Sequence, residues 1–171
     1  APTSSTTAML ALGDALAVVV AERKGFKERD FAFLHPGGQL GRRLLLRVRD
    51  IMRTADENPV VRESAKVKEV LLAITRARAG SASIVNVRGE LVGIFTDGDL
   101  RRHLDSTSNL TELRVGTVMT RHPKTVDADH LAAEALRILR EHKIDELVVV
   151  DGRRKPVGLL DVQDLLKAGF V

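Results

Sequence analysis

Two stretches of the sequence concentrate side chains that could do chemistry, and they are near copies of each other. The first runs from Gly93 to Leu100 and the second from Gly158 to Leu165, with the glycine and the last aspartate six positions apart in both. In the first copy, Asp97 and Asp99 offer the oxygen ligands that hard cations prefer. Two carboxylates without further ligands make a weak metal site, so we expect neither a metal nor a cofactor here.

Another candidate is the single imidazole of His35, in the turn sequence His35-Pro36-Gly37-Gly38. The proline favours an extended conformation of the residue before it, and the two glycines allow the backbone to approach a ligand closely. Taken by itself, such a histidine is more often structural or solvated than catalytic. The other histidines show no metal-ligand spacing, and we interpret them as surface residues: His103, His122, His130 and His142.

The elements that must position the duplicated stretch are duplicated as well. Each copy follows an opening Ile51-Met52 or Val118-Met119, a segment with helical spacing and a short apolar run. Such a unit has about 50 residues, and even a 60-residue domain buries only about 60% of its chain surface. We therefore expect the two units to pack on each other and share a core.

Hydrophobic spacing predicts the same order of elements in both units. In the first unit we expect strands at 60–61, 83–87 and 91–95 and helices over 67–74 and 97–104, with Ser64 as a helix N-cap. In the second we expect strands at 125–126, 147–150 and 157–160 and helices over 131–139 and 162–168. The polar segment 105–116 connects them.

These motifs resemble the cystathionine β-synthase (CBS) family. One CBS motif is similar to the set formed by Met52, Pro59-Val60-Val61, Ser83 to Asn86 and Gly93 to Leu100. A second CBS motif is similar to 118–166. A tandem pair resembles a Bateman module, a ligand-sensing unit attached to enzymes, channels and transporters. The resemblance covers residues 48 to 171 and implies an α/β fold of two βαββα-like repeats packed face to face.

In that family, nucleotides lie in clefts between the two repeats. The hydroxyl of a Gly-x-x-Thr/Ser motif contacts phosphate, and the aspartate three residues later binds the ribose. The resemblance therefore implies that Thr96 contacts phosphate and Asp99 contacts ribose, beside Pro59, Val60, Ser83 and Ile84. It implies a second site with Asp164 for the ribose, near Thr125, Val126, Leu147 and Val148.

The second copy departs from this pattern because Asp161 stands where the hydroxyl is expected. Like charges 4 Å apart repel by about 1 kcal/mol in water and about 4 kcal/mol at an effective dielectric constant of about 20. We therefore expect one nucleotide-type ligand per chain, bound through Thr96 and Asp99. The alternative is that Asp99 and Asp164 only cap the helices that they enter.

Residues 1 to 47 carry a second resemblance. Ala8 to Arg23 indicates a helix that is apolar on every side and ends at Gly25, and 27–33 indicates a short helix. In bacterial arabinose 5-phosphate isomerases, a sugar isomerase (SIS) domain precedes a CBS pair. The junction between these two domains resembles the present sequence at 2–8, 10–17 and 35–44, which lead into the CBS pair. We expect an SIS tail at 1–47 and CBS repeats at 48–106 and 107–171; alternatively, the first helix is free-standing and packs on the repeats or on a second copy.

This resemblance implies an enzyme that interconverts ribulose 5-phosphate and arabinose 5-phosphate for Kdo and lipopolysaccharide synthesis. It implies that His35 is an active-site residue that reaches a substrate held by another subunit, where a neutral imidazole can move protons near neutral pH. The family's remaining catalytic groups lie upstream of Ala1, so we expect these 171 residues alone to be inactive. We expect dimers of CBS pairs, a tetrameric parent enzyme, and an adenine nucleotide or CMP-Kdo as effector.

The amino-acid composition argues against several other classes of function. The chain has no cysteine, which excludes disulfides, thiolate metal sites and cysteine nucleophiles. Aromatic residues are 3% with no Trp or Tyr, and the net charge is only +4, so we expect no nucleic-acid partner. No uninterrupted apolar run approaches the roughly 18 residues of a membrane span, and we expect a cytoplasmic protein without a membrane partner. Two rival functions stay open: a free-standing adenine-nucleotide-binding CBS module and a purely structural oligomerisation unit.

Overall fold

The computed structural model describes residues 2–34, 44–104 and 109–170. The chain divides into two compact units, Ala1–Leu45 and Leu46–Val171, which we describe separately. The predicted active-site residue His35 lies outside the described residues. The second unit contains both expected repeats.

The first unit contains the helices α1 (Ser4–Arg23) and α2 (Glu28–Leu34). Gly25 has φ +63° and the amide of Phe26 donates to the Ala21 carbonyl, which confirms that the glycine ends the first helix. No residue of α1 is buried. Its length and its mean hydropathy of 1.6 would allow it to cross a membrane, which is weak evidence because soluble core helices pass the same test. The sequence shows no uninterrupted apolar run of this length, because Gly13 and Asp14 lie between the apolar residues of this continuous helix.

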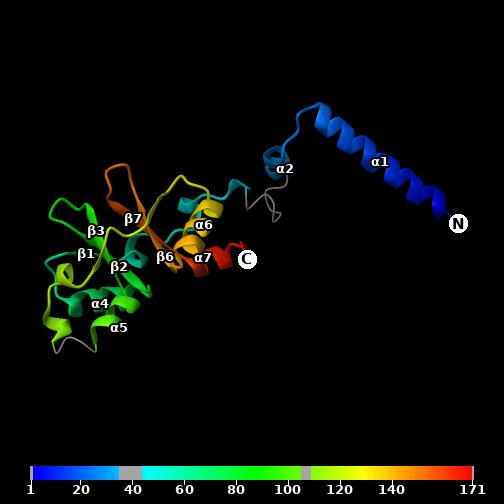
Figure 1. Cartoon of the computed structure of the whole chain (residues 1–171). Coiled ribbons are helices and arrows are strands. Elements are labelled where there is room, and N and C mark those ends of the chain that lie inside the picture. The colour runs from blue at the N-terminus through cyan, green and yellow to red at the C-terminus, as the bar shows by residue number, and fades with distance from the viewer. Residues whose placement is uncertain (1, 35–43, 105–108, 171) are drawn as a thin grey trace. The chain divides into compact units, whose positions relative to one another are not determined.

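The second unit contains two small sheets, each with its helices (Figure 1). The first sheet has the order β1-β2-β3-β4 and the second the order β5-β6-β7. In both, the first two strands are parallel and the next is antiparallel. The first repeat comprises β1 (Val60–Arg62), α4 (Val67–Ala77), β2 (Ser81–Val85), β3 (Leu91–Thr96) and α5 (Asp97–Leu104). The second comprises β4 (Thr120–Arg121), β5 (Thr125–Asp127), α6 (Ala132–His142), β6 (Glu146–Val150), β7 (Pro156–Asp161) and α7 (Val162–Lys167).

The predicted βαββα order is thus confirmed, with two local corrections in the first repeat. The strand expected at 83–87 lies at Ser81–Val85, because the Asn86 side chain accepts from the amides of Arg88 and Glu90 and starts a turn. The N-cap of α4 is Lys66, not Ser64, and the Glu69 carboxylate accepts from the Lys66 amide.

The two repeats share one strand register, which lets their residues be matched in pairs. Ser81 lies opposite Thr96 in the first sheet, and Glu146 lies opposite Asp161 in the second. Both ladders shift at the same point, between Ile84 and Val85 and between Val149 and Val150. Thr96 and Asp161 therefore hold equivalent positions.

The opening segment of each repeat pairs with a strand in the sheet of the other repeat. Thr120, at the start of the second repeat, pairs with Ile94 of β3 in the first. Arg53, at the start of the first repeat, pairs with Leu159 of β7 in the second. Thr120 and Arg53 are therefore also equivalent.

Two glycines make this exchange possible. A Cβ atom on Gly93 would overlap the Met119 side chain, and one on Gly158 would overlap that of Met52. The opening methionine of each repeat thus packs where the other repeat has a glycine, which explains why the Ile/Val-Met pair and the glycine recur together.

Each repeat buries one face of its longer helix. The buried residues are Val67, Val70, Ile74 and Ala77 on α4 and Ala132, Ala135, Leu136 and Leu139 on α6. A third, smaller cluster of Leu91, Ile94 and Val148 takes side chains from both repeats, so apolar packing also holds the repeats together.

Candidate functional site

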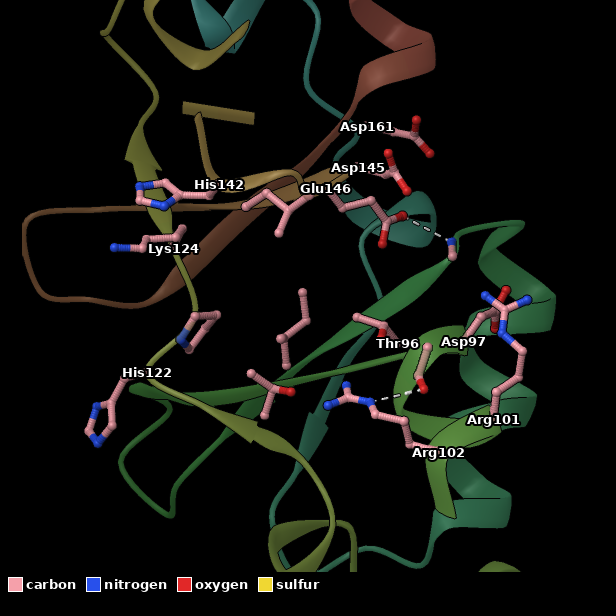
Figure 2. A pocket seen from close by; sticks show the side chains of 16 residues that line it. Thr96, Asp97, Arg101, Arg102, His122, Lys124, His142, Asp145, Glu146 and Asp161 are labelled. Carbon is pink, nitrogen blue, oxygen red and sulfur yellow. Dashed lines mark hydrogen bonds between the residues drawn. The ribbon is translucent and has the colours of Figure 1, made fainter. Parts of the chain in front are cut away.

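A cleft of about 720 Å³ lies between the repeats (Figure 2). Its first wall is the junction of β3 and α5, with Thr96, Asp97, Gly98, Arg101 and Arg102. Its second wall comes from the β4–β5 segment, with Thr120, His122, Pro123 and Lys124. Its third wall belongs to the second repeat, with His142, Ile144, Asp145, Glu146 and Asp161.

Thr96 and Asp99 are brought together, but they stand differently with respect to the cleft. Asp99 Oδ2 accepts from the Thr96 amide at 2.9 Å and from the Thr96 hydroxyl at 3.0 Å, while the Asp99 amide donates to that hydroxyl at 3.1 Å. This reciprocal arrangement caps the start of α5. Thr96 lines the cleft, whereas Asp99 lies behind it and is 2% exposed.

The Asp99 carboxylate has further partners. Its Oδ1 atom accepts from the Thr120 hydroxyl at 2.8 Å and from the Arg102 guanidinium. These are the contacts of a capping and positioning residue, so ribose binding by Asp99 stays a prediction.

The second repeat has different chemistry at the equivalent positions. Asp161 caps α7 by accepting from the Gln163 amide at 2.7 Å, and Asp164 accepts from the Asp161 amide at 3.1 Å. Arg53 donates to both oxygens of Asp164, from Nε at 2.9 Å and from Nη2 at 3.2 Å. Asp161 lines the cleft and Asp164 does not.

The residues expected beside the base do not line this cleft: Pro59, Val60, Ser83, Ile84, Thr125, Val126, Leu147 and Val148. Val60 pairs with Ser83, and Thr125 pairs with Val148, so they belong to the parallel strand pairs of the two sheets. Ser83, Ile84 and Val148 are buried. Their predicted role as ligand contacts therefore stays a prediction.

Charged side chains of both signs line the cleft. Arg101, Arg102 and Asp97 stand on the first-repeat side, and the carboxylates of Asp145, Glu146 and Asp161 gather on the other (Figure 2). Burial raises the pKa of Glu146, although the Ser81 hydroxyl and the Gly80 amide, which donates at 3.0 Å, oppose this shift. Arg102 is paired with Asp99, so Arg101 and the backbone amides at the start of α5 are the groups on this side that favour an anion.

Sequence reasoning missed the charged lining residues Arg101, Arg102, Lys124, Asp145 and Glu146, and it also missed two histidines and Arg53. His122 and His142 are exposed, as expected of surface residues, yet both line the cleft. Arg53 could have been found by aligning Met52-Arg53 with Met119-Thr120, because its positive charge accompanies the extra negative charge of Asp161. Among the described residues, no group of three or more His, Asp or Glu side chains is placed to hold a metal ion.

Comparison with known sequences gives two matches. Residues 48–106 and 115–170 match the family model of the CBS domain. The chain is 51% identical over 171 residues to arabinose 5-phosphate isomerase KdsD of Pseudomonas aeruginosa and 47% identical over 171 residues to that of Escherichia coli K12. In both cases the match covers 100% of this chain and 52% of the relative, so the chain spans about half the length of these curated relatives.

Solved structures show a similar fold. The CBS-pair protein CBSX2 of Arabidopsis thaliana, in complex with AMP, is 27% identical with a TM-score of 0.61, and the match covers 73% of this chain and 96% of that one. An uncharacterised conserved protein of Pyrococcus horikoshii is 27% identical with a TM-score of 0.63, over 72% of this chain and 91% of that one.

Proposed function

Because this chain belongs to the CBS domain family, we propose that its repeat pair is the nucleotide-sensing part of an arabinose 5-phosphate isomerase. Such an enzyme interconverts ribulose 5-phosphate and arabinose 5-phosphate for Kdo and lipopolysaccharide synthesis. Support comes from the 51% identity, over the whole chain, to a relative with that name. The parent protein would be a cytoplasmic homo-oligomer, with dimers of CBS pairs within a tetramer.

The observation that carries the sensing role is that the basic side chains of Arg101, Arg102 and Lys124 line the cleft between the repeats. An effector phosphate would lie at the start of α5, beside Thr96 and Arg101, and Lys124 lines the cleft from the β4–β5 segment. Hydrogen bonds from charged donors to phosphate are among the stronger ones in proteins. The AMP complex of CBSX2 supports a nucleotide as the anion. The effector would be an adenine nucleotide or the activated sugar CMP-Kdo.

Asp99 would serve this site in one of two ways. To bind ribose, its carboxylate would exchange the hydrogen bonds from Thr120 or Arg102 for bonds from the sugar hydroxyls. Otherwise it would act by holding the Thr96 hydroxyl and the start of α5 in place. The first role leaves the capping contacts with Thr96 intact, so the two roles are compatible.

Catalysis would belong to the parent enzyme. His35 would reach a substrate bound by another subunit, and the 171 residues alone would not isomerise sugar phosphates. An assay of the chain with arabinose 5-phosphate should show no product above the rate without protein. Turnover by this chain would overturn that part of the proposal.

A purely structural oligomerisation unit is the second candidate. It is favoured by α1, whose large apolar side chains, Met9, Leu10, Leu12, Leu16 and Val18 among them, are exposed. Light scattering during size-exclusion chromatography should report at least a dimer in either case. The candidates differ in ligand binding, which the next experiment measures.

A thermal-shift screen of the chain against AMP, ATP, CMP, CMP-Kdo and arabinose 5-phosphate tests the sensing role. A ligand at 100 times its Kd stabilises the folded state by about 2.7 kcal/mol. We expect one nucleotide to raise the Tm, and the double variant Arg101→Gln/Lys124→Gln to lose most of that rise. Arg137→Gln is the matched control, because this exposed arginine on α6 lies outside the cleft. No shift with any compound would favour the structural unit.

A further inference from the structure

We infer that Arg53 closes the second repeat's half of the cleft, and that this residue limits the chain to one ligand. The inference rests on the proposed nucleotide binding beside Thr96. It concerns a residue that neither the Gly-x-x-Thr/Ser motif nor the aspartate following it includes.

The first step is the equivalence of positions in the two repeats. The strand registers match Thr96 with Asp161, and the exchanged opening segments match Thr120 with Arg53. Asp99 and Asp164 lie three positions after Thr96 and Asp161, so they are equivalent as well. A hydroxyl-hydroxyl-carboxylate set in the first repeat thus becomes a carboxylate-guanidinium-carboxylate set in the second.

The second step is the one-sided shape of the cleft. Eight residues on the first-repeat side line it: Gly80, Ile94, Thr96, Asp97, Gly98, Arg101, Arg102 and Thr120. Their counterparts are Asp145, Leu159, Asp161, Val162, Gln163, Leu166, Lys167 and Arg53, and of these only Asp145 and Asp161 line the cleft. The cleft therefore opens beside α5 and does not extend along α7.

The third step is the position of the Arg53 side chain, which is 15% exposed. Its guanidinium binds both oxygens of Asp164, lies 3.4 Å from Asp161, and donates to the Arg78 carbonyl at 3.3 Å. Thr120 at the equivalent position reaches only Oδ1 of Asp99, the oxygen that also accepts from Arg102, so among the described residues no cation binds both oxygens of Asp99. A ribose entering the second half would find both acceptor atoms of Asp164 already occupied by an internal cation.

The charges of this set depend on one another. Asp161 and Asp164 without Arg53 would place two poorly solvated carboxylates together, and Arg53 without them would leave a poorly solvated cation unpaired. Substituting Arg53 alone is therefore a poor test, because removing its charge destabilises the fold. The double variant Arg53→Thr/Asp161→Thr removes one charge of each sign and recreates the set found in the first repeat.

The test is a calorimetric titration of the 171-residue chain with AMP and with CMP. We expect one ligand per chain for the natural sequence and two for Arg53→Thr/Asp161→Thr. The matched control is Arg49→Thr/Asp129→Thr, which removes an exposed arginine-aspartate pair outside the cleft and should leave the stoichiometry unchanged. Circular dichroism before each titration shows that the variant is folded.

The outcomes separate this inference from the proposed function. If the natural chain binds neither AMP nor CMP and no compound of the thermal-shift screen raises its Tm, the proposed function fails, yet a double variant that then binds one equivalent supports the closing role of Arg53. If the folded double variant binds no more ligand than the natural chain, the inference is overturned, whatever the natural chain binds. A variant that does not fold overturns the argument that its set is interchangeable with that of the first repeat.

Discussion

The first repeat caps α5 with a threonine hydroxyl, and the second caps α7 with a carboxylate. Thr120 contacts Asp99 in the first repeat and Arg53 contacts Asp164 in the second, while strand direction, register and helix faces stay the same. This comparison indicates that the apolar residues and glycines shared by the repeats specify the strand and helix arrangement. Two polar positions then decide which half of the cleft is open.

The largest effect should come from core residues at equivalent positions, because there the repeats are alike. Phe95→Ala and Leu160→Ala each create a cavity in a fully buried site and should lower the free energy of unfolding by about 3–5 and about 2–5 kcal/mol. Denaturant unfolding followed by circular dichroism measures both. The exposed Leu72→Ala is the control, with an effect within about 0.5 kcal/mol.

The shape of those unfolding curves bears on the comparison as well. The cluster of Leu91, Ile94 and Val148 joins the repeats, so we expect a single transition for both variants. A plateau at half of the signal would show instead that one repeat can unfold while the other stays folded.

A smaller and unequal effect should follow from the two equivalent polar residues. Arg53→Gln leaves Asp161 and Asp164 without their cation and should cost about 3 kcal/mol. Thr120→Val removes one hydrogen bond to the buried Asp99 and should cost about 1–3 kcal/mol. Both are measured by denaturant unfolding, with Arg49→Gln as the exposed control. Equal costs would mean that the two sets are energetically alike.

The smallest effect should be a dependence on pH at Glu146, whose counterpart in the first repeat is Ser81. Burial raises the pKa of Glu146, so the folded state holds the proton more tightly than the unfolded state. Stability from this group is therefore complete below the ordinary carboxyl pKa of about 4.5 and is lost as pH rises through the higher folded pKa.

Glu146→Gln should remove this loss. The variant should gain stability relative to the natural chain as pH rises above about 4.5 and should show little gain below it. Unfolding free energies between pH 4 and pH 7, with the exposed Glu141→Gln as control, would check the sign. A difference that does not vary with pH would contradict the assigned cause.

Much of the fold could be predicted from the sequence because its signals are local. The duplicated glycine-aspartate spacing and the helical apolar spacing indicated two βαββα repeats, and the family match confirms the resemblance to the CBS family. The site was harder to predict, because each half of the cleft takes a residue from the opening segment of the other repeat. Thr120 and Arg53 lie far in sequence from the aspartates that they contact, and only the strand exchange reveals the pairing.

The strand exchange also has a consequence for how the protein is made. The amide of Val48 donates to the His130 carbonyl, and Arg53 pairs with Leu159, so the earliest part of the first repeat completes the second. A ribosome releases these residues long before their partners exist, and pairing over such a distance in sequence is slow. A gene cut between the repeats should therefore yield two pieces that each lack the backbone pairing and the methionine contact supplied by the other, and co-expression should rescue both.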